Sequence, residues 1–272
     1  MNKEEDFINV RKMIANKNPK LLKWLPGFVI RYIERILHQD EINNFIKTHD
    51  SKNQEFCSDV IDYIGVKYTV HGIENIPKTG KCVLVMNHPL GGMDAMLLVD
   101  ALKNHRTDVK FIVNDLLLHL EPLNGIFVGV NKIGKASAES LQKVNELFAS
   151  DNLVCVFPSG LVSRKQKGVI KDLFWKKTFV RLAKQNNSTI VPIHIEGRLT
   201  NWFYNLSNFR RFIGIKANIE MLYLSDEMFK QKGQTIHFTV GKSIQASELT
   251  NEKTEIQWSE WFRQHIYSLP KK

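Results

Sequence analysis

The stretch VLVMNHPLGGMDAMLLV, residues 83–99, places His88 and Asp94 in a glycine-containing turn between two apolar runs. A carboxylate that bonds one imidazole nitrogen fixes the tautomer of the ring, and the other nitrogen can then take a proton from a hydroxyl or an amine. Gly91 and Gly92 give the turn the backbone freedom to bring Asp94 to His88. A purely structural role fits these residues equally well, because an acid at the start of a helix interacts with the positive end of the helix dipole.

Short apolar segments alternate along the chain with segments of helical spacing. Strands are predicted at residues 66–72, 82–86, 110–114, 126–130, 154–157, 190–196, 219–224 and 236–240. Helices are predicted at 93–104, 138–149 and 173–185, with a closing helix capped by Thr250. This alternation predicts an α/β fold with a mixed, largely parallel central sheet flanked by helices. Ligands meet such sheets at the carboxyl ends of strands, where the strand at 82–86 leads into Asn87 and His88.

The N-terminal part of the chain has a different pattern. Residues 18–47 carry a broad apolar stripe at helical spacing, with basic residues among them and Trp24 beside Pro26-Gly27, which divides the stretch into two helices. A basic amphipathic helix with a tryptophan can lie in a membrane interface, or it can pack on the domain core; both readings remain open. We predict a membrane-association segment at 1–64 and an α/β domain at 65–272.

The overall charge indicates an acidic partner. The formal net charge is +10, which suits either nucleic acid or an anionic membrane surface, and nucleic acid is disfavoured because no zinc-finger spacing or arginine-rich arm is present. The three scattered cysteines indicate a reducing compartment, and we expect neither a secretory signal nor a membrane-spanning segment. The composition therefore favours a protein that is soluble or bound peripherally to a membrane.

The segment NHPLGGMD resembles the lysophospholipid acyltransferase superfamily, which includes the glycerol-phosphate and acylglycerol-phosphate acyltransferases. The signature of that superfamily is a histidine and an aspartate separated by four residues after a strand, whereas here five residues separate His88 from Asp94. The stretch looks most like a bacterial group often labelled hemolysins, which includes lyso-ornithine-lipid and glycine-lipid O-acyltransferases. In that group the longer spacing is usual.

Three further blocks extend the resemblance over residues 65–245. In GIFVGVNKIG, Asn131 stands near the position of the family's arginine. The block FPSG at 157–160 has Ser159 in place of the family's glutamate, followed by Gly160. The fourth block is the Val-Pro-Ile strand at 191–193. The serine points away from glycerol phosphate as the acceptor and toward another head group.

The resemblance implies an enzyme that moves a fatty acyl chain from acyl carrier protein or coenzyme A to a lysolipid hydroxyl. His88 would be the general base and Asp94 its orienting partner, and amides of the glycine turn or of Gly160 would stabilise the oxyanion. The side chain of Arg164 would bind an acceptor carboxylate or the donor's phosphopantetheine. The implied substrate-binding residues are Asn87, Gly91, Gly92, Asn131, Ser159, Gly160 and Arg164.

The expected acceptor is an aminoacyl lysolipid, lyso-ornithine or lyso-glycine lipid, at an anionic membrane surface on the cytoplasmic face of the inner membrane. No metal and no cofactor other than the thioester co-substrate is expected. Two alternatives stay open: an acylglycerol-phosphate acyltransferase of phospholipid synthesis, and a non-catalytic protein that binds membrane lipid.

Overall fold

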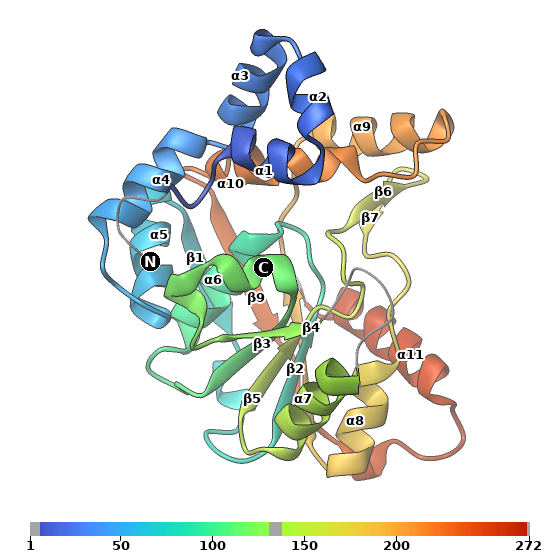
Figure 1. The fold of residues 1–272 in the computed structure, drawn as a ribbon. Coiled ribbons are helices and arrows are strands. Elements are labelled where there is room, and N and C mark those ends of the chain that lie inside the picture. Colours follow the sequence, from blue (N-terminus) through green and yellow to red (C-terminus); the bar gives the residue numbers. More distant parts are fainter. Residues whose placement is uncertain (1–5, 131–137, 271–272) are drawn as a thin grey trace.

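The computed structural model describes residues 6–130 and 138–270, which form an α/β fold around one central sheet (Figure 1). The strand order is β1-β9-β8-β2-β5-β3-β4, with β10 also paired to β8. Among the described strand pairs of this sheet, those of β8 with β9 and with β10 are antiparallel and the others are parallel. The strands are β1 Lys67–His71, β2 Cys82–Met86, β3 Val109–Asn114, β4 Phe127–Val130, β5 Leu153–Val156, β8 Thr189–Ile195, β9 Thr235–Val240 and β10 Ile244–Gln245. The predicted mixed, largely parallel sheet is confirmed.

The strand β2 lies inside the sheet, between β5 and β8, and all five of its residues are buried. Leu84 and Met86 belong to one hydrophobic cluster, and Val83 and Val85 to another. A strand covered on both faces needs a continuous apolar run, and this is the pattern of residues 82–86. The loop that follows β2 therefore starts at the carboxyl edge of the sheet, near its middle.

Helices cover both faces of the sheet (Figure 1). On the face of Leu84 and Met86, the cluster includes residues of α5 Gln54–Ile64 and α6 Gly92–Leu102. On the face of Val83 and Val85, it includes residues of α7 Ala138–Ala149, α8 Thr178–Asn186 and α11 Glu255–Ser268. Short 3-10 turns lie at η1 Ile73–Asn75, η2 Asp115–His119, η3 Glu121–Leu123, η4 Ile219–Tyr223 and η5 Ala246–Glu248.

Four N-terminal helices precede α5: α1 Val10–Lys17, α2 Pro19–Trp24, α3 Gly27–Ile36 and α4 Gln39–Thr48. The predicted division at Pro26-Gly27 is confirmed, and a second break lies at His38, whose φ of 50° ends the helical run. In Figure 1, α1, α2 and α3 lie at one end of the molecule, with α9 Asn201–Phe212 and α10 Leu224–Phe229 beside them. None of the helices in the described parts of the chain has the length and apolar character needed to span a bilayer.

Three predicted elements differ from the structure. Residues 219–224 form the turn η4 and the first residue of α10 rather than a strand, because the carboxylate of Glu220 lies among arginines in the interior. The helix predicted from 173 begins only at Thr178, since the preceding residues form a loop held by the buried Trp175, whose indole N–H donates to Asp172. The closing helix is capped by Thr254, not Thr250, through reciprocal bonds between Thr254 and Gln257. A short hairpin, β6 Arg164–Gln166 with β7 Val169–Lys171, was not predicted.

Candidate active site

The predicted pairing of His88 with Asp94 is present in the structure. The imidazole Nδ1 of His88 lies 2.9 Å from Oδ2 of Asp94, in the loop between β2 and the start of α6. The side chain of Asp94 is fully buried, whereas that of His88 is 17% exposed. The pair thus combines a sheltered carboxylate with an imidazole that reaches the surface at the carboxyl end of a central strand.

The glycine turn brings the two side chains together. Gly91 has a φ of 74°, a conformation that glycine adopts without strain, and its carbonyl accepts the amide of Asp94 at 3.0 Å. The amide of Leu90 donates to Oδ2 of Asp94 at 2.9 Å. Asp94 therefore lies in the first turn of α6 with its carboxylate directed back over the loop. The two roles considered for Asp94 are compatible in this geometry: its carboxylate lies at the positive end of the α6 dipole and also bonds the imidazole of His88.

These contacts determine which nitrogen of His88 is basic. Oδ2 of Asp94 is a hydrogen-bond acceptor, so Nδ1 of His88 carries the proton and Nε2 has a free lone pair. The ring of Phe157, from the loop after β5, stacks on the imidazole at 3.9 Å between centroids and 20° between planes. The imidazole is held from one side by a carboxylate and across its face by an aromatic ring, which suits it to accept a proton in a defined direction.

Burial shapes the electrostatics of Asp94. Removal from water raises the pKa of its carboxyl, and the hydrogen bonds from His88 and from the Leu90 amide act in the opposite direction. The second oxygen, Oδ1, has no hydrogen-bond partner among the described residues. An ionised Asp94 is therefore short of favourable contacts, and a positive imidazolium on His88 supplies one.

Asn87, predicted to bind substrate, has a structural role in the sheet. Its side-chain amide donates to the carbonyl of Ile195 at 2.8 Å, and its side-chain oxygen accepts the amide of Ile195 at 2.7 Å. Both polar groups of this buried side chain are thus used to join the ends of β2 and β8. Asn87 is 2% exposed, and its contact with substrate stays a prediction.

Arg164, expected to bind an acceptor carboxylate or phosphopantetheine, is likewise buried. Its guanidinium lies 3.0 Å from Glu220 and 5.0 Å above the ring of Phe203. The same carboxylate of Glu220 also pairs with Arg210. The predicted role is wrong, because a guanidinium that is 3% exposed and already bound to a buried carboxylate cannot reach a substrate.

The other predicted contacts have different outcomes. The amide of Gly160 donates to the carbonyl of Phe157 at 2.9 Å, so it is not free to bind an oxyanion. The hydroxyl of Ser159 closes the same turn by donating to the carbonyl of Leu161 at 2.6 Å, and its contact with substrate stays a prediction. Gly92 is exposed, and outside its chain neighbours and the backbone of its own helix no described atom lies within 4 Å of the place that a Cβ would take; its contact with substrate stays a prediction. Asn131 lies outside the described residues.

Asp172 joins the catalytic loop, our name for the segment from Asn87 to Gly91 that carries the proposed base His88, to two other segments, and the sequence patterns did not single it out. Its Oδ1 accepts the backbone amide of His88 at 3.2 Å and the hydroxyl of Ser163 at 2.5 Å. Its Oδ2 accepts the indole N–H of Trp175 at 2.8 Å, and its own amide donates to the hydroxyl of Tyr267 on α11. Asp172 is 1% exposed. Asp172 therefore holds the backbone of His88 in place, and we expect it to position that residue without contacting a reacting atom.

The variant Asp172→Asn should lower kcat by about tenfold or more with little change in KM, and it should lower the free energy of unfolding by about 1–3 kcal/mol. The reason is that the groups bonded to the two oxygens of this carboxylate are all hydrogen-bond donors. The NH2 of an asparagine, itself a donor, would have to face one of them without forming a bond. The variant Trp175→Phe is the control, since it removes the bond to Oδ2 and leaves Oδ1 on His88. It should lose stability but retain kcat at temperatures where it is folded. Equal losses of kcat in both variants would contradict the positioning role.

Fold and site together define an α/β protein that pairs a histidine with a buried aspartate at the carboxyl end of a central strand. The model of the acyltransferase family matches residues 12–272. A lyso-glycine lipid O-acyltransferase of Phocaeicola vulgatus is 42% identical over 267 residues, which cover 97% of this chain and 95% of that relative. One of Bacteroides thetaiotaomicron is 43% identical over 265 residues, 97% of each chain. The solved structure of the 1-acyl-sn-glycerophosphate acyltransferase PlsC from Thermotoga maritima is 17% identical, with a TM-score of 0.49 and coverage of 97% of this chain and 95% of that one.

This chain belongs to the acyltransferase family. The resemblance drawn from its motifs is therefore confirmed, as is the prediction of an enzyme that transfers acyl groups.

Proposed function

We propose that this enzyme transfers a fatty acyl chain from an acyl thioester to the hydroxyl of a lyso-glycine lipid at a membrane surface. The observation that carries the proposal is the 2.9 Å bond between His88 and the buried carboxylate of Asp94, which leaves Nε2 of a partly exposed imidazole free to act as a base. The two relatives named for this activity support the choice of acceptor, since they align with nearly the whole chain.

In the proposed reaction, Nε2 of His88 takes the proton of the acceptor hydroxyl while the oxygen of that hydroxyl attacks the thioester carbonyl. A C–O bond forms, and the tetrahedral intermediate then collapses with cleavage of the C–S bond. The imidazolium returns its proton to the departing thiolate, so that an ester and a thiol leave the site. Asp94 stabilises the imidazolium between these two proton transfers. The donor is the thioester of acyl carrier protein or of coenzyme A.

We assign the stabilisation of the oxyanion to the start of α6. The amide of Gly160 is engaged with Phe157, whereas Gly92 and Met93 begin α6, and the first amides of a helix have no acceptor within it. They also lie at the positive end of the helix dipole. The first residue of α6, Gly92, follows His88 by four positions. A single short segment therefore supplies both the base and the amides.

For recognition of the acceptor carboxylate we propose Lys176 in place of Arg164. Lys176 is exposed, and its Nζ lies 3.8 Å from the place that a Cβ on Gly160 would take, beside the turn whose Phe157 stacks on His88. The neighbouring Lys177 pairs with Glu255 at 2.8 Å and provides a matched control. The exposed amine of Lys176 is a cation at the rim of the site, and a lyso-glycine lipid has a free carboxylate.

The test is acyl transfer by the purified enzyme to lyso-glycine lipid, to its methyl ester, to lyso-ornithine lipid and to lysophosphatidic acid. We expect lyso-glycine lipid to be the best acceptor. The variant Lys176→Met should lower kcat/KM for the carboxylate by about tenfold and leave the methyl ester unaffected, because one charge-assisted contact is lost. The variant Lys177→Met should match the parent. Preference for lysophosphatidic acid would contradict the proposed acceptor, and equal losses on both glycine acceptors would contradict the role of Lys176.

We further propose that the N-terminal helices attach the enzyme to the cytoplasmic face of the inner membrane, where acyl thioesters are available. No residue of α2 is buried, and Trp24 and Phe28 are 83% and 67% exposed. Between residues 10 and 36 the chain has seven Lys and Arg residues and one Glu. Exposed aromatic side chains among basic residues favour the interface of an anionic membrane.

A further inference from the structure

The helix α9 is apolar on two sides. Its inner side buries Phe203 and Tyr204 together with the polar residues Ser207 and Arg210. A second apolar stripe follows at intervals of three or four residues and remains outside the core. Its exposed members are Trp202, Phe209, Phe212 and Ile213, with exposed fractions of 54%, 59%, 88% and 49%. A surface helix needs one apolar side to pack on its domain, so the second side has another use.

The end of this stripe continues into an apolar loop that the structure holds firmly. Phe209, Phe212, Ile213 and the 39% exposed Ile215, with Arg211 and Lys216 among them, form what we call the α9 tip. The buried side chain of Arg210 pairs with Glu220, donates to the carbonyl of Ile215 at 3.1 Å and bonds Asn218. A buried ion pair thus keeps apolar side chains directed into solvent.

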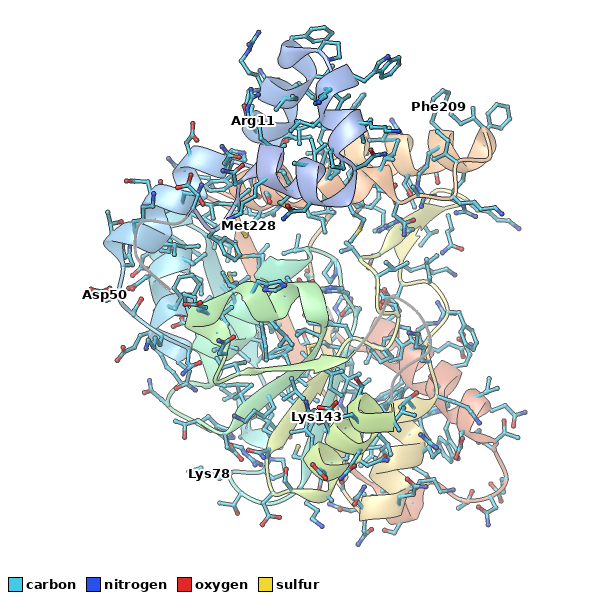
Figure 2. The ribbon with its side chains drawn as sticks, in the orientation of Figure 1. Arg11, Asp50, Lys78, Lys143, Phe209 and Met228 are labelled. Carbon is cyan, nitrogen blue, oxygen red and sulfur yellow. The ribbon has the colours of Figure 1, made fainter. Side chains whose placement is uncertain are left out.

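The charge and position of the α9 tip indicate its partner. No acidic residue occurs from 201 to 219, and Arg211 and Lys216 are exposed. Figure 2 shows Phe209 near the outer end of α9, and Figure 1 places this helix at the same end of the molecule as α2 and α3. Apolar side chains ringed by cations complement a bilayer with anionic headgroups, in which the rings enter the acyl region and the cations meet phosphates.

We propose that the α9 tip is a second membrane-contact site, which inserts into an anionic leaflet beside the N-terminal helices. The inference rests on the proposed function in one respect, that the acceptor is a membrane lipid. The N-terminal helices and the α9 tip are separated along the chain by about 180 residues. Two such contacts hold a protein on a membrane in one orientation, whereas the N-terminal helices alone would attach it without fixing its orientation. The active site then keeps a constant orientation relative to the membrane that contains the acceptor lipid.

The test places a fluorophore on the tip. The three native cysteines are buried, so the variant Phe212→Cys can be labelled selectively with nitrobenzoxadiazole. With vesicles of phosphatidylcholine and phosphatidylglycerol, the emission should rise and shift to the blue, and less so at high salt. A label at Leu141→Cys on α7, also an exposed apolar position, is the control and should not respond. Vesicle-bound enzyme with an unchanged signal at residue 212 would overturn the proposal, as would absence of vesicle binding. A response to acyl carrier protein alone would assign the tip to a protein partner and overturn it too.

A second measurement separates this inference from the proposed function. The double variant Phe212→Ser with Ile213→Ser should bind these vesicles at least about tenfold more weakly, because apolar area leaves the bilayer. Acyl transfer to acceptor dispersed in detergent should match the parent, since the tip lies outside the catalytic loop. Undiminished vesicle binding would overturn the inference even if transfer is observed, and failure of all transfer with intact binding would overturn only the proposed function.

Discussion

The variant His88→Ala should transfer acyl chains about a thousandfold more slowly than the parent enzyme, with the fold retained. The proposed mechanism has one base, and a positioned general base contributes about 10²- to 10⁴-fold to the rate. The side chain of His88 bonds Asp94, stacks on the ring of Phe157 and is 17% exposed, so its loss should lower the free energy of unfolding yet leave the core of the sheet intact. Steady-state transfer to lyso-glycine lipid, with thermal unfolding followed in parallel, measures both effects.

The control for this variant is His237→Ala, on β9, whose Nδ1 bonds the hydroxyl of Thr69 and which has no role in the proposed site. It should transfer at the parent rate. Added imidazole should restore part of the activity of His88→Ala, since the missing group is a base. A His88→Ala enzyme as active as the parent would disprove the proposed mechanism whatever its acceptor.

The variant Asp94→Asn should lose about 10²- to 10⁴-fold in kcat without losing stability at neutral pH. The amide oxygen of asparagine can keep the bonds from Nδ1 of His88 and from the Leu90 amide, but it carries no charge and therefore stabilises the imidazolium far less than a carboxylate does. Burial raises the pKa of the Asp94 carboxyl in the folded state, so its ionisation opposes folding. The asparagine variant is uncharged and avoids this cost.

The sign of the pH dependence follows from the raised pKa. Below the ordinary pKa of an aspartate, about 4, Asp94 is protonated in the folded and the unfolded parent, and the unfolding free energy is at its full value. As the pH rises through the raised pKa of the folded state, ionisation of the buried carboxyl lowers the unfolding free energy. The unfolding free energy of Asp94→Asn relative to the parent should therefore increase as the pH rises from about 4. Denaturant unfolding at a series of pH values measures this difference.

Asp108→Asn is the control with the opposite sign. The guanidinium of Arg106 lowers the pKa of the Asp108 carboxyl, so Asp108 contributes stability above the ordinary aspartate pKa and loses it as the pH falls through the lowered value. Asp108→Asn should be destabilised at neutral pH, with the difference disappearing in acid, and it should transfer acyl chains normally. If Asp94→Asn were instead destabilised relative to the parent, and most strongly at neutral pH, the ionised carboxylate of Asp94 would stabilise the fold, contrary to the expected sign.

The sequence by itself determined the centre of the site, since the parts that make it are close together in the chain. The apolar run of residues 82–86 requires a strand covered on both faces, and the glycines after it let Asp94 reach His88 across six positions. The first of the blocks resembling the acyltransferase family, NHPLGGMD, is this same stretch. Local turn geometry decides a contact of this range, so the residues could be named before the fold was known.

Only the tertiary structure decided which polar residues serve the fold. Arg164 meets Glu220 over 56 positions, and Asp172 meets the amide of His88 over 84, so no local pattern indicates that either is engaged. The apolar spacing of residues 219–224 is typical of a strand, but the ion pairs of Glu220 hold a turn there instead.

The α9 tip is the converse case. Its residues have the pattern of a buried helix, and burial depends on what the rest of the chain places against it. Sequence spacing reports which side chains are apolar and how they recur. Whether such a side faces the core or a membrane is decided when segments far apart in the chain pack together, because only then is it known which surface remains uncovered.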